Sequence, residues 1–187
     1  MASIPFKSQL PNRGTTFNAL FNLIQGPMRI VETGTIRGHL DDFKFGDGHS
    51  TLRFAEYISR FGGELYSVDI DPMAVMISKA LCTKEFPLIA DDVHIIESDS
   101  VAFLESFDEP IDVLYLDSDN DAELILNEAK AALGCLHEES LVLIDDCFNK
   151  GNYHVEKGSL VIPFLEENGW EMEVSEYQAL FIHKDRF

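Results

Sequence analysis

The sequence predicts an α/β fold in which helices cover both faces of a doubly wound, mostly parallel sheet. Three observations support this. Short apolar runs rich in β-branched residues alternate with helical patterns along most of the 187 residues. Each run ends on or just before a carboxylate, and capping residues, Pro or Gly mark the helix ends. Repeated strand, helix, strand units require right-handed crossovers, and therefore parallel pairing.

In chain order, the apolar runs predict five buried strands, at residues 29–32, 64–69, 93–97, 111–117 and 141–145. The stretches between them predict helices at 50–61, 72–81, 100–107 and 122–133. Asp71 is expected to cap the helix that begins at Pro72, and Gly62 and Gly134 to follow helix ends. Ligands bind beyond the carboxyl ends of such strands, so the strand-end acids are expected to line one crevice.

The two ends of the chain complete the predicted domain. A further helix at 159–168 precedes strands at 171–174 and 178–183, which predict an antiparallel pair and hence an antiparallel C-terminal edge strand. A helix at 15–23 lies within an N-terminal segment, 1–28. We expect this segment to pack on the sheet, or to cover the cleft, of a single domain at 29–187.

The charge and cysteine content exclude several classes of protein. Asp and Glu number 33 against 14 Lys and Arg, a net charge of -19 that repels nucleic acid and anionic lipid, although salt adaptation would produce the same excess. The three widely spaced cysteines match neither a disulfide framework nor a metal-binding pair. No apolar run is long enough to span a membrane, and no secretory signal is recognisable, so we expect a cytoplasmic protein.

Glycines and a helix start follow the first predicted strand. Gly34 lets the backbone approach a ligand, and residues 48–51 place backbone N–H groups and a hydroxyl at a helix N-terminus, where they attract an anion. The dinucleotide fingerprint G-x-G-x-x-G is absent. Glu32, at the strand end, would repel a pyrophosphate and attract an ammonium. A ligand with an amino-acid tail fits both features best.

The next two predicted strands end in acids that suit a nucleoside. Asp69 can accept hydrogen bonds from both ribose hydroxyls, and Asp99 can accept one from the exocyclic amine of adenine. A single acid of this kind is more often a helix cap or part of a solvated turn. Amino acid, ribose and adenine in strand order nevertheless describe S-adenosylmethionine.

The sequence resembles the class I S-adenosylmethionine-dependent methyltransferases over residues 29–183. The motifs that carry the resemblance are Glu32-Thr-Gly-Thr35 with Gly48-His-Ser50, Tyr66-Ser-Val-Asp-Ile-Asp71, Glu97-Ser-Asp99 and the ends of the two later strands. It implies a Rossmann-like methyltransferase sheet with a methyl-donor site at its edge. The donor-binding residues that it implies are Glu32, Thr33, Gly34, Thr35, Ser50, Thr51, Asp69, Asp99, Ser100 and Asp117. The usually compact glycine-rich loop is interrupted at 36–45 by a segment that is either a lid or an inert insertion.

The fourth and fifth predicted strands end in three acids, Asp117, Asp145 and Asp146. Neighbouring parallel strands would bring them together, and clustered carboxylates raise one another's pKa unless a cation neutralises them. Oxygen ligands with room for water and substrate suit Mg²⁺, with Mn²⁺ or Ca²⁺ as alternatives. Such an ion would bind two substrate oxygens and lower the pKa of a hydroxyl.

This arrangement resembles the metal-dependent O-methyltransferases of the catechol and macrocin types, which implies that the three acids bind the metal. The catechol type carries a lysine shortly after the fourth-strand acid, where this chain has Ser118-Asp-Asn120. Asp119 is then the nearest candidate for a catalytic base and His154 is a second. Solvation or local capping would explain either residue equally well. The neighbourhoods of Lys157 and of Tyr177-Gln178 are interpreted as structural.

We therefore expect methyl transfer from S-adenosylmethionine to a hydroxyl of a small acceptor, helped by a divalent metal. The acceptor walls would come from the N-terminal segment, the 36–45 insertion, the loop after Asp146 or a second subunit of a homo-oligomer. One alternative is a non-catalytic module that binds S-adenosylmethionine or S-adenosylhomocysteine (SAH). A metal-dependent phosphatase would need its Asp-x-Asp strand first in the chain. An EF-hand formed by 117–128 would need glycine in place of Ala122.

Overall fold

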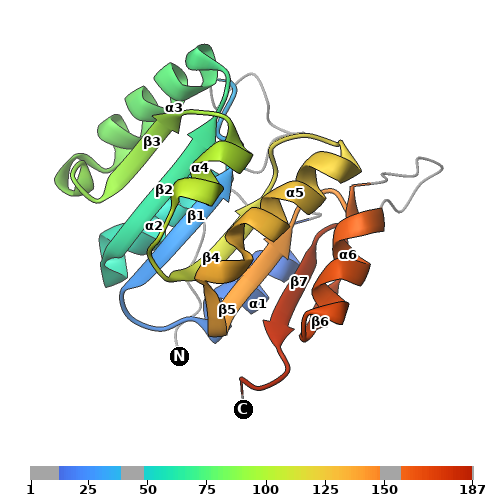
Figure 1. Ribbon diagram of the computed structural model, residues 1–187. Helices are drawn as coiled ribbons and strands as arrows, with labels where there is room; N and C mark the ends of the chain where they lie inside the picture. The colour runs from blue at the N-terminus through green and yellow to red at the C-terminus, as the bar shows by residue number, and fades with distance from the viewer. Residues whose placement is uncertain (1–12, 39–48, 148–156, 187) are drawn as a thin grey trace.

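The apolar runs of the sequence form a seven-stranded sheet, and the segments between them form helices that cover it (Figure 1). The computed structural model describes residues 13–38, 49–147 and 157–186. The strands are β1 (Met28–Thr33), β2 (Gly63–Asp69), β3 (Val93–Glu97), β4 (Ile111–Leu116), β5 (Leu136–Ile144), β6 (Trp170–Ser175) and β7 (Ala179–His183). The helices are α1 (Gly14–Leu23), α2 (Ser50–Phe61), α3 (Pro72–Glu85), α4 (Ser100–Ser106), α5 (Ala122–Ala132) and α6 (Gly158–Glu167), with short 3₁₀ turns at Pro87–Ile89 and Leu133–Cys135.

The strand order is β3-β2-β1-β4-β5-β7-β6. Strands β1 to β5 pair in parallel, whereas β7 runs antiparallel to both β5 and β6. The predicted fold class is thus confirmed, including the antiparallel pair at the C-terminal edge. Within that pair β7 is the reversed strand, and β6 lies outside it at the edge of the sheet. All five parallel strands therefore end along one side of the sheet, where the strand-end acids follow them.

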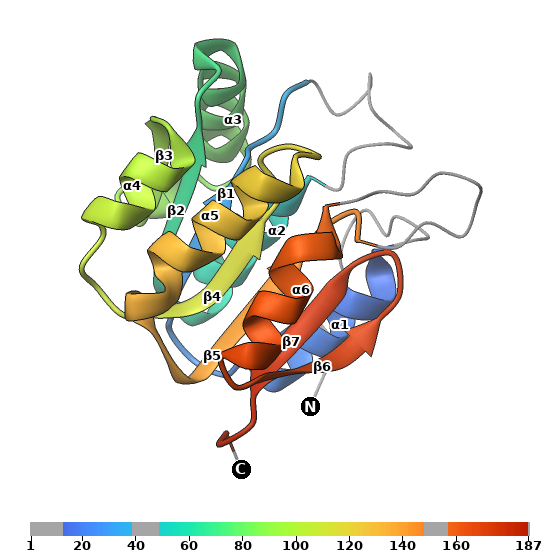
Figure 2. The same ribbon diagram turned by 45° about the vertical axis from the view of Figure 1, so that its right-hand side comes forward.

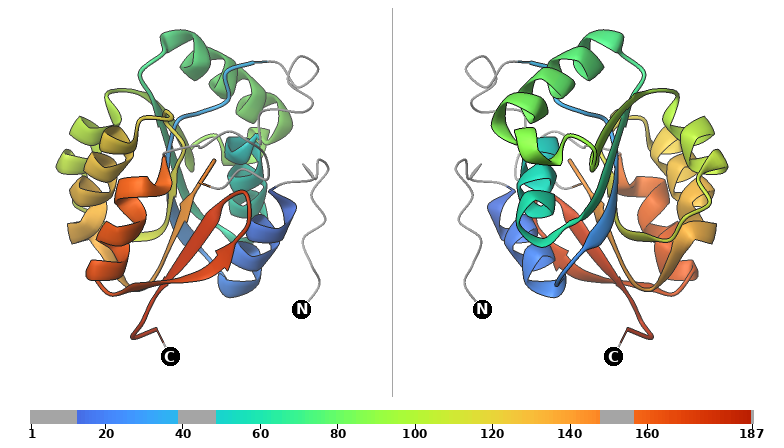
Figure 3. Two further views of the ribbon diagram at one scale, coloured as in Figure 1. Left: turned by 90° about the vertical axis from the view of Figure 1, so that its right-hand side faces the viewer. Right: turned by 90° about the vertical axis from the view of Figure 1, so that its left-hand side faces the viewer.

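Alternating residues of each central strand pack against different helices. Figure 3 shows the sheet edge-on, with α1, α2 and α3 on one face and α4, α5 and α6 on the other. In β4, Tyr115 packs among Phe17 and Phe54 of the first set, and Leu114 and Leu116 pack against the second set. Both faces of the central strands are buried, which is why these strands are continuous apolar runs in the sequence.

Helix α1 belongs to the same core as the sheet. Phe17 and Leu20 are fully buried, and α1 contacts β6 and β7 from the face opposite α6 (Figure 2). Residues 1–12 of the predicted N-terminal segment lie outside the described residues. In the part of the chain that the structure describes, no helix is both long enough and apolar enough to cross a membrane.

Most predicted boundaries lie within one residue of the observed ones, and two differ by four residues or more for local physical reasons. Strand β5 begins at Leu136 rather than at 141, because its polar first half is only partly covered and so lacks the apolar pattern of a buried strand. Helix α3 continues to Glu85 rather than ending at 81, and it ends where Pro87 disfavours helical geometry in the residue before it. Gly134 lies inside a 3₁₀ turn and does not follow a helix end in a left-handed conformation.

Candidate donor pocket and acidic cluster

A pocket opens at the carboxyl ends of β1, β2, β4 and β5, beside the start of α2. Ligands of parallel α/β sheets bind at this edge. Six of the residues predicted from the sequence line this pocket, and five others join them. The predicted ones are Gly34, Thr35, Ser50, Asp69, Asp117 and Asp146, and the others are Arg13, Ile36, Arg37, His49 and Ser118.

Gly34 forms the tight turn after β1. Its φ is +83°, and its N–H donates to the Val68 carbonyl at 2.7 Å. A Cβ added to Gly34 would stand 2.4 Å from the carbonyl oxygen of Asp117, closer than real Cβ contacts come. Only glycine therefore allows the turn to lie this close to the end of β4.

Asp69, at the end of β2, presents a fixed carboxylate to the pocket. Its Oδ2 accepts from the Thr35 N–H at 3.0 Å, and its Oδ1 accepts from the Asp71 N–H at 2.8 Å. The first bond ties the end of β2 to the turn that Gly34 makes possible, and the second fixes the carboxylate within its own loop. A carboxylate has about four acceptor positions, so two remain for a ligand. Asp71 caps α3 by accepting from the Met73 N–H at 2.9 Å, as predicted.

Glu32 lies behind the pocket wall and is fully buried. Its Oε2 accepts from the hydroxyls of Thr51 at 2.7 Å and Ser67 at 2.5 Å. Burial raises the pKa of Glu32 from 4.5 to about 7, and hydrogen bonds from Ser50, Ser67 and Thr51 offset only part of that rise. Glu32 therefore reaches the pocket through hydroxyls at the start of α2 and not by lining it.

The raised pKa of Glu32 gives a testable pH dependence. The folded protein binds this proton more tightly than the unfolded chain, so its stability should fall as the pH rises from 4.5 to 7 and level off above. For this one group the loss is about 3 kcal/mol. Glu32→Gln keeps an acceptor for both hydroxyls and should remove this loss. Urea unfolding of both proteins at pH 5 and pH 7.5 measures it, and parallel pH profiles would contradict the raised pKa.

Besides Glu32 and Thr51, three predicted donor residues lie off the pocket wall. Thr33 is buried and donates to Glu128 Oε2 at 2.9 Å, and Ser100 also lies beside Glu128. Asp99 caps α4 by accepting from the Ala102 N–H at 2.9 Å. It nevertheless stands at the same edge, because the Ser98 N–H donates to the Asp69 carbonyl. Contact of these three residues with a donor stays a prediction.

The same contacts remove the EF-hand alternative. Glu128 lies on the buried side of α5 and binds Thr33, whereas the ligand loop would need it to face a cation beside 117–121. Asp121 caps α5 by accepting from the N–H groups of Glu123 and Leu124. An apolar strand precedes the acids, and no second helix flanks them as an EF-hand requires.

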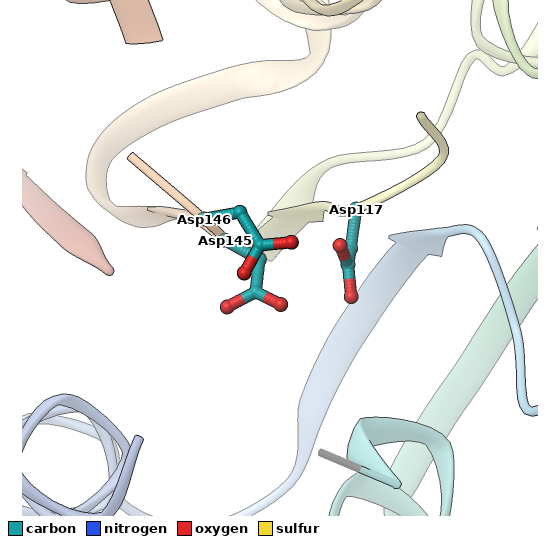
Figure 4. Close-up of side chains that lie close together, drawn as sticks. All are labelled: Asp117, Asp145 and Asp146. Carbon is teal, nitrogen blue, oxygen red and sulfur yellow. The ribbon is translucent and has the colours of Figure 1, made fainter. Parts of the chain in front are cut away.

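The three acids at the ends of β4 and β5 come together as predicted. Figure 4 shows Asp117, Asp145 and Asp146 converging at this edge, and one oxygen of each lies within 4.8 Å of the others. Asp146 has a φ of +51°, which is uncommon for a residue other than glycine. This left-handed backbone brings two consecutive acids into one cluster. We call Asp117, Asp145 and Asp146 the acidic cluster.

A buried arginine from the residue before α1 pairs with the acidic cluster. Arg13 Nε donates to the two oxygens of Asp145 at 2.9 and 3.0 Å, and its NH2 group donates to Asp145 at 2.7 Å and to Asp146 at 3.1 Å. Gln178 Nε2 donates to the same Asp145 carboxylate at 2.7 Å. Burial alone would raise the pKa of Asp145, but Arg13 outweighs it and holds that pKa below its usual value.

A buried lysine pairs with the other side of the acidic cluster. Lys157, just before α6, is 1% exposed and its Nζ lies 2.8 Å from Asp117 Oδ1. Burial would lower the pKa of Lys157, but the charge of Asp117 outweighs it and raises that pKa. Tyr115 donates from its hydroxyl to Asp117 Oδ2 at 3.3 Å. The residues interpreted as structural, Lys157 and Gln178, thus both contact the acidic cluster.

Asp119 lines a second hollow next to the first. This hollow shares Arg37, Asp117, Ser118 and Asp146 with the donor pocket and extends to Lys157. Asp119 is exposed, so a molecule in the hollow could reach it. The other candidate base, His154, lies outside the described residues, as do residues 39–48 of the predicted insertion and its flank.

The sequence does not reveal Arg13, Lys157 and Gln178 as partners of the acids, because they reach the acidic cluster through tertiary packing. They come from three separate segments, and no spacing links them to the acids. The available signal was charge balance. Three clustered acids need cations, and the chain has only 14 Lys and Arg.

Comparison with known proteins gives a family match and a fold match. A family model described as "Methyltransferase domain" matches residues 43–147, more than half of the chain. The chain is 25% identical over 124 residues to the O-methyltransferase ankF of Aspergillus thermomutatus, in an alignment that covers 66% of this chain and 47% of ankF. The chain thus spans about half the length of this curated relative.

Two of the solved structures that share the fold illustrate the likeness. An rRNA methylase from Streptococcus thermophilus superposes with a TM-score of 0.61 at 8% identity, over 96% of this chain and 99% of that one. An O-methyltransferase from Bacillus cereus in complex with SAH superposes with a TM-score of 0.62 at 18% identity, over 95% of this chain and 82% of that one. At these identities the likeness shows the fold and does not distinguish one acceptor from another.

Proposed function

This chain belongs to the methyltransferase domain family, and on that basis we propose that it transfers a methyl group from S-adenosylmethionine to a hydroxyl of a small acceptor. The donor would lie in the pocket at the carboxyl ends of β1, β2 and β4. The observation that carries the proposal is the Asp69 carboxylate, held at the pocket wall by the Thr35 and Asp71 N–H groups with acceptor positions left for two ribose hydroxyls.

The rest of the pocket suits the amino-acid portion of the donor. Gly34 and Thr35 bring backbone close to the centre of the pocket, and Ser50 begins α2. The first N–H groups of a helix and its dipole favour a carboxylate at that place. The SAH complex of the Bacillus cereus O-methyltransferase supports this choice of donor, because it has the same fold.

The second hollow would hold the acceptor. It adjoins the donor pocket through shared residues, and its polar and charged lining suits a hydroxylated molecule. The sulfonium of the donor already carries a good leaving group, so the protein has to align the hydroxyl and accept its proton. We propose Asp119 as the proton acceptor. Although one structural neighbour is an rRNA methylase, the net charge of -19 argues against a nucleic-acid acceptor here.

The predicted divalent metal does not fit the contacts of the acidic cluster. Both oxygens of Asp145 accept from Arg13, one of them also from Gln178, and Asp117 is paired with Lys157. A metal ion would need those lone pairs. The proposed transfer therefore includes no step at a metal. Nor do we propose a phosphatase, because the family match is to a methyltransferase domain.

Donor binding is tested with Asp69→Asn. The variant loses the negative charge that would accept from the ribose hydroxyls, and hydrogen bonds to charged groups contribute about 1.5–3 kcal/mol. We therefore expect SAH to bind roughly 10- to 100-fold more weakly in isothermal titration calorimetry. Asp71→Asn is the matched control, because this exposed acid caps α3 and does not line the pocket. Equal affinity of Asp69→Asn and wild type would remove Asp69 from the donor site.

Transfer itself is tested with S-adenosylmethionine labelled on its methyl group. The purified protein is offered sugars, catechols and phenols, and the label is followed into the product. Label on an acceptor oxygen supports the proposed function. Binding of SAH without transfer to any acceptor in the panel would instead favour the non-catalytic binding module.

A further inference from the structure

We infer that the Arg13 guanidinium and the Lys157 ammonium occupy the place of a divalent cation, so that the acidic cluster works without a bound metal. The inference deepens the proposed function, and its part about methyl transfer rests on that function. Its other part, that Arg13 and Lys157 stand in place of a metal ion, rests on the geometry of the described residues alone. It assigns Arg13 and Lys157 as positioning residues, which hold the carboxylates that border both hollows.

The first support is the use of carboxylate oxygens. Arg13 approaches Asp145 side-on, with Nε and an NH2 group both within 3.0 Å of its oxygens. Paired N–H donors in this geometry make the strongest hydrogen bonds to a carboxylate. Mg²⁺ requires carboxylate lone pairs at about 2.0–2.1 Å in a near-octahedral arrangement. The guanidinium therefore has to leave before Asp145 can bind such an ion.

The second support is the network that holds Arg13 in place. Its guanidinium lies over the Tyr177 ring, 4.8 Å from the ring centre, and its backbone carbonyl accepts from the Thr16 hydroxyl. The Thr16 hydroxyl shares this one proton with the side-chain oxygen of Gln178, whose amide donates to Asp145 and to Tyr115. Arg13 is thus held through its backbone by α1, and through its side chain by Tyr177 of the β6–β7 turn and by Asp145 after β5.

The third support is charge. The acidic cluster carries three carboxylates, and Arg13 and Lys157 return two positive charges at direct contact. Arg13 and Lys157 are almost fully buried, at 6% and 1% exposure, so water screens their positive charges weakly. They would therefore repel any further cation placed between the acids. Burial and the neighbouring Asp145 still raise the pKa of Asp117 well above its usual value. Asp117 and Asp146 border both hollows.

Mn²⁺ binding to the full chain tests the inference without donor or acceptor present. The free Mn²⁺ signal in electron paramagnetic resonance falls when a protein binds the ion. We expect wild type to cause no stoichiometric loss of signal. Arg13→Gln should free Asp145 and Asp146 and bind Mn²⁺ at least about tenfold more tightly than wild type. Arg60→Gln is the matched control, because within the described residues Arg60 pairs with Glu56 on the surface of α2 and not with the acidic cluster, and it should behave as wild type.

Stoichiometric Mn²⁺ binding by wild type, displaced by Mg²⁺, would overturn the inference. No gain by a folded Arg13→Gln would also overturn it, because the guanidinium would then not be what excludes the ion. Circular dichroism reports whether the variant folds. If it does not, Lys157→Gln takes its place with the same expected gain. Arg13→Lys restores a positive charge and should return Mn²⁺ binding to the wild-type level, which a merely structural role would not produce.

A separate calorimetry experiment measures SAH binding in the presence of EDTA. It distinguishes failure of the proposed function, seen as no SAH binding, from failure of this inference, seen in the Mn²⁺ experiment.

Discussion

Gly34→Ala is expected to abolish measurable SAH binding and to lower the free energy of unfolding by about 1–3 kcal/mol. Two effects add. A φ of +83° is strained for alanine, and the new Cβ would stand 2.4 Å from the Asp117 carbonyl oxygen and 2.8 Å from its carbon. Because both atoms are backbone at the end of β4, they cannot swing away, so the turn or the strand end must shift. Calorimetry with SAH and urea unfolding measure the two losses.

Gly26→Ala is the matched control for Gly34→Ala. Gly26 has a φ of +79°, almost the same backbone conformation, but nothing lies within 4 Å of an added Cβ. It should lose about 1 kcal/mol from strain alone and bind SAH as wild type does. If Gly34→Ala also kept its SAH affinity, close approach of this turn to β4 would be irrelevant to the donor, and the pocket would have to be assigned differently.

Asp145→Asn should be the most destabilising single change in the acidic cluster, at about 3–5 kcal/mol. Asp145 is fully buried and accepts from Arg13 and Gln178. The amide nitrogen of asparagine would face one of these donors, and the Arg13 guanidinium would lose its main counter-charge in a buried position. Urea unfolding at neutral pH measures the change.

The comparison with Asp146→Asn and the pH dependence make the prediction for Asp145 specific. Asp146 is 21% exposed at its side chain and shares one Arg13 contact at 3.1 Å, so its variant should lose about 1 kcal/mol or less. The folded-state pKa of Asp145 lies below its unfolded value of 3.8. Its stabilisation is therefore fully present above about pH 4 and is lost as the pH falls through the folded value. Equal losses in the two variants would contradict this account of the ion pair.

The fold could be predicted because its core elements are encoded locally. The central strands β1 and β4 are largely buried and so appear as apolar runs, and the sequence predicts α2 with its observed bounds, 50–61. The edge strand β3 is only partly buried, but its β-branched residues still mark it at 93–97. The prediction is weaker where a strand is polar, as in the first half of β5. Because parallel strands end at the same edge of a sheet, the sequence alone also predicts that Asp117, Asp145 and Asp146 lie together there.

The partners of these acids could not be predicted in the same way. Arg13, Lys157 and Gln178 stand outside the repeating strand and helix pattern, and their distance from the acids along the chain carries no information about distance in space. The prediction of a metal follows from the need for positive charge at the three acids, and by the inference above Arg13 and Lys157 supply that charge from within the chain. The acids that cap helices, Asp71 and Asp99, show the converse limit, since a strand-end acid has the same sequence pattern whether it faces a ligand or a helix N-terminus.

The contacts of Arg13 and Thr16 also bear on how the protein folds. Arg13 meets Asp145 across 132 positions of sequence, and Thr16 meets Gln178 across 162. Contacts of such long range form only after the intervening chain has been ordered, because closing so large a loop costs entropy before it gains a contact. We expect the central strands to assemble first, and the contacts of Arg13 with Asp145 and of Thr16 with Gln178 to form among the last. A folding intermediate in which α1 has not yet packed on the sheet would therefore contain the sheet but lack a complete site.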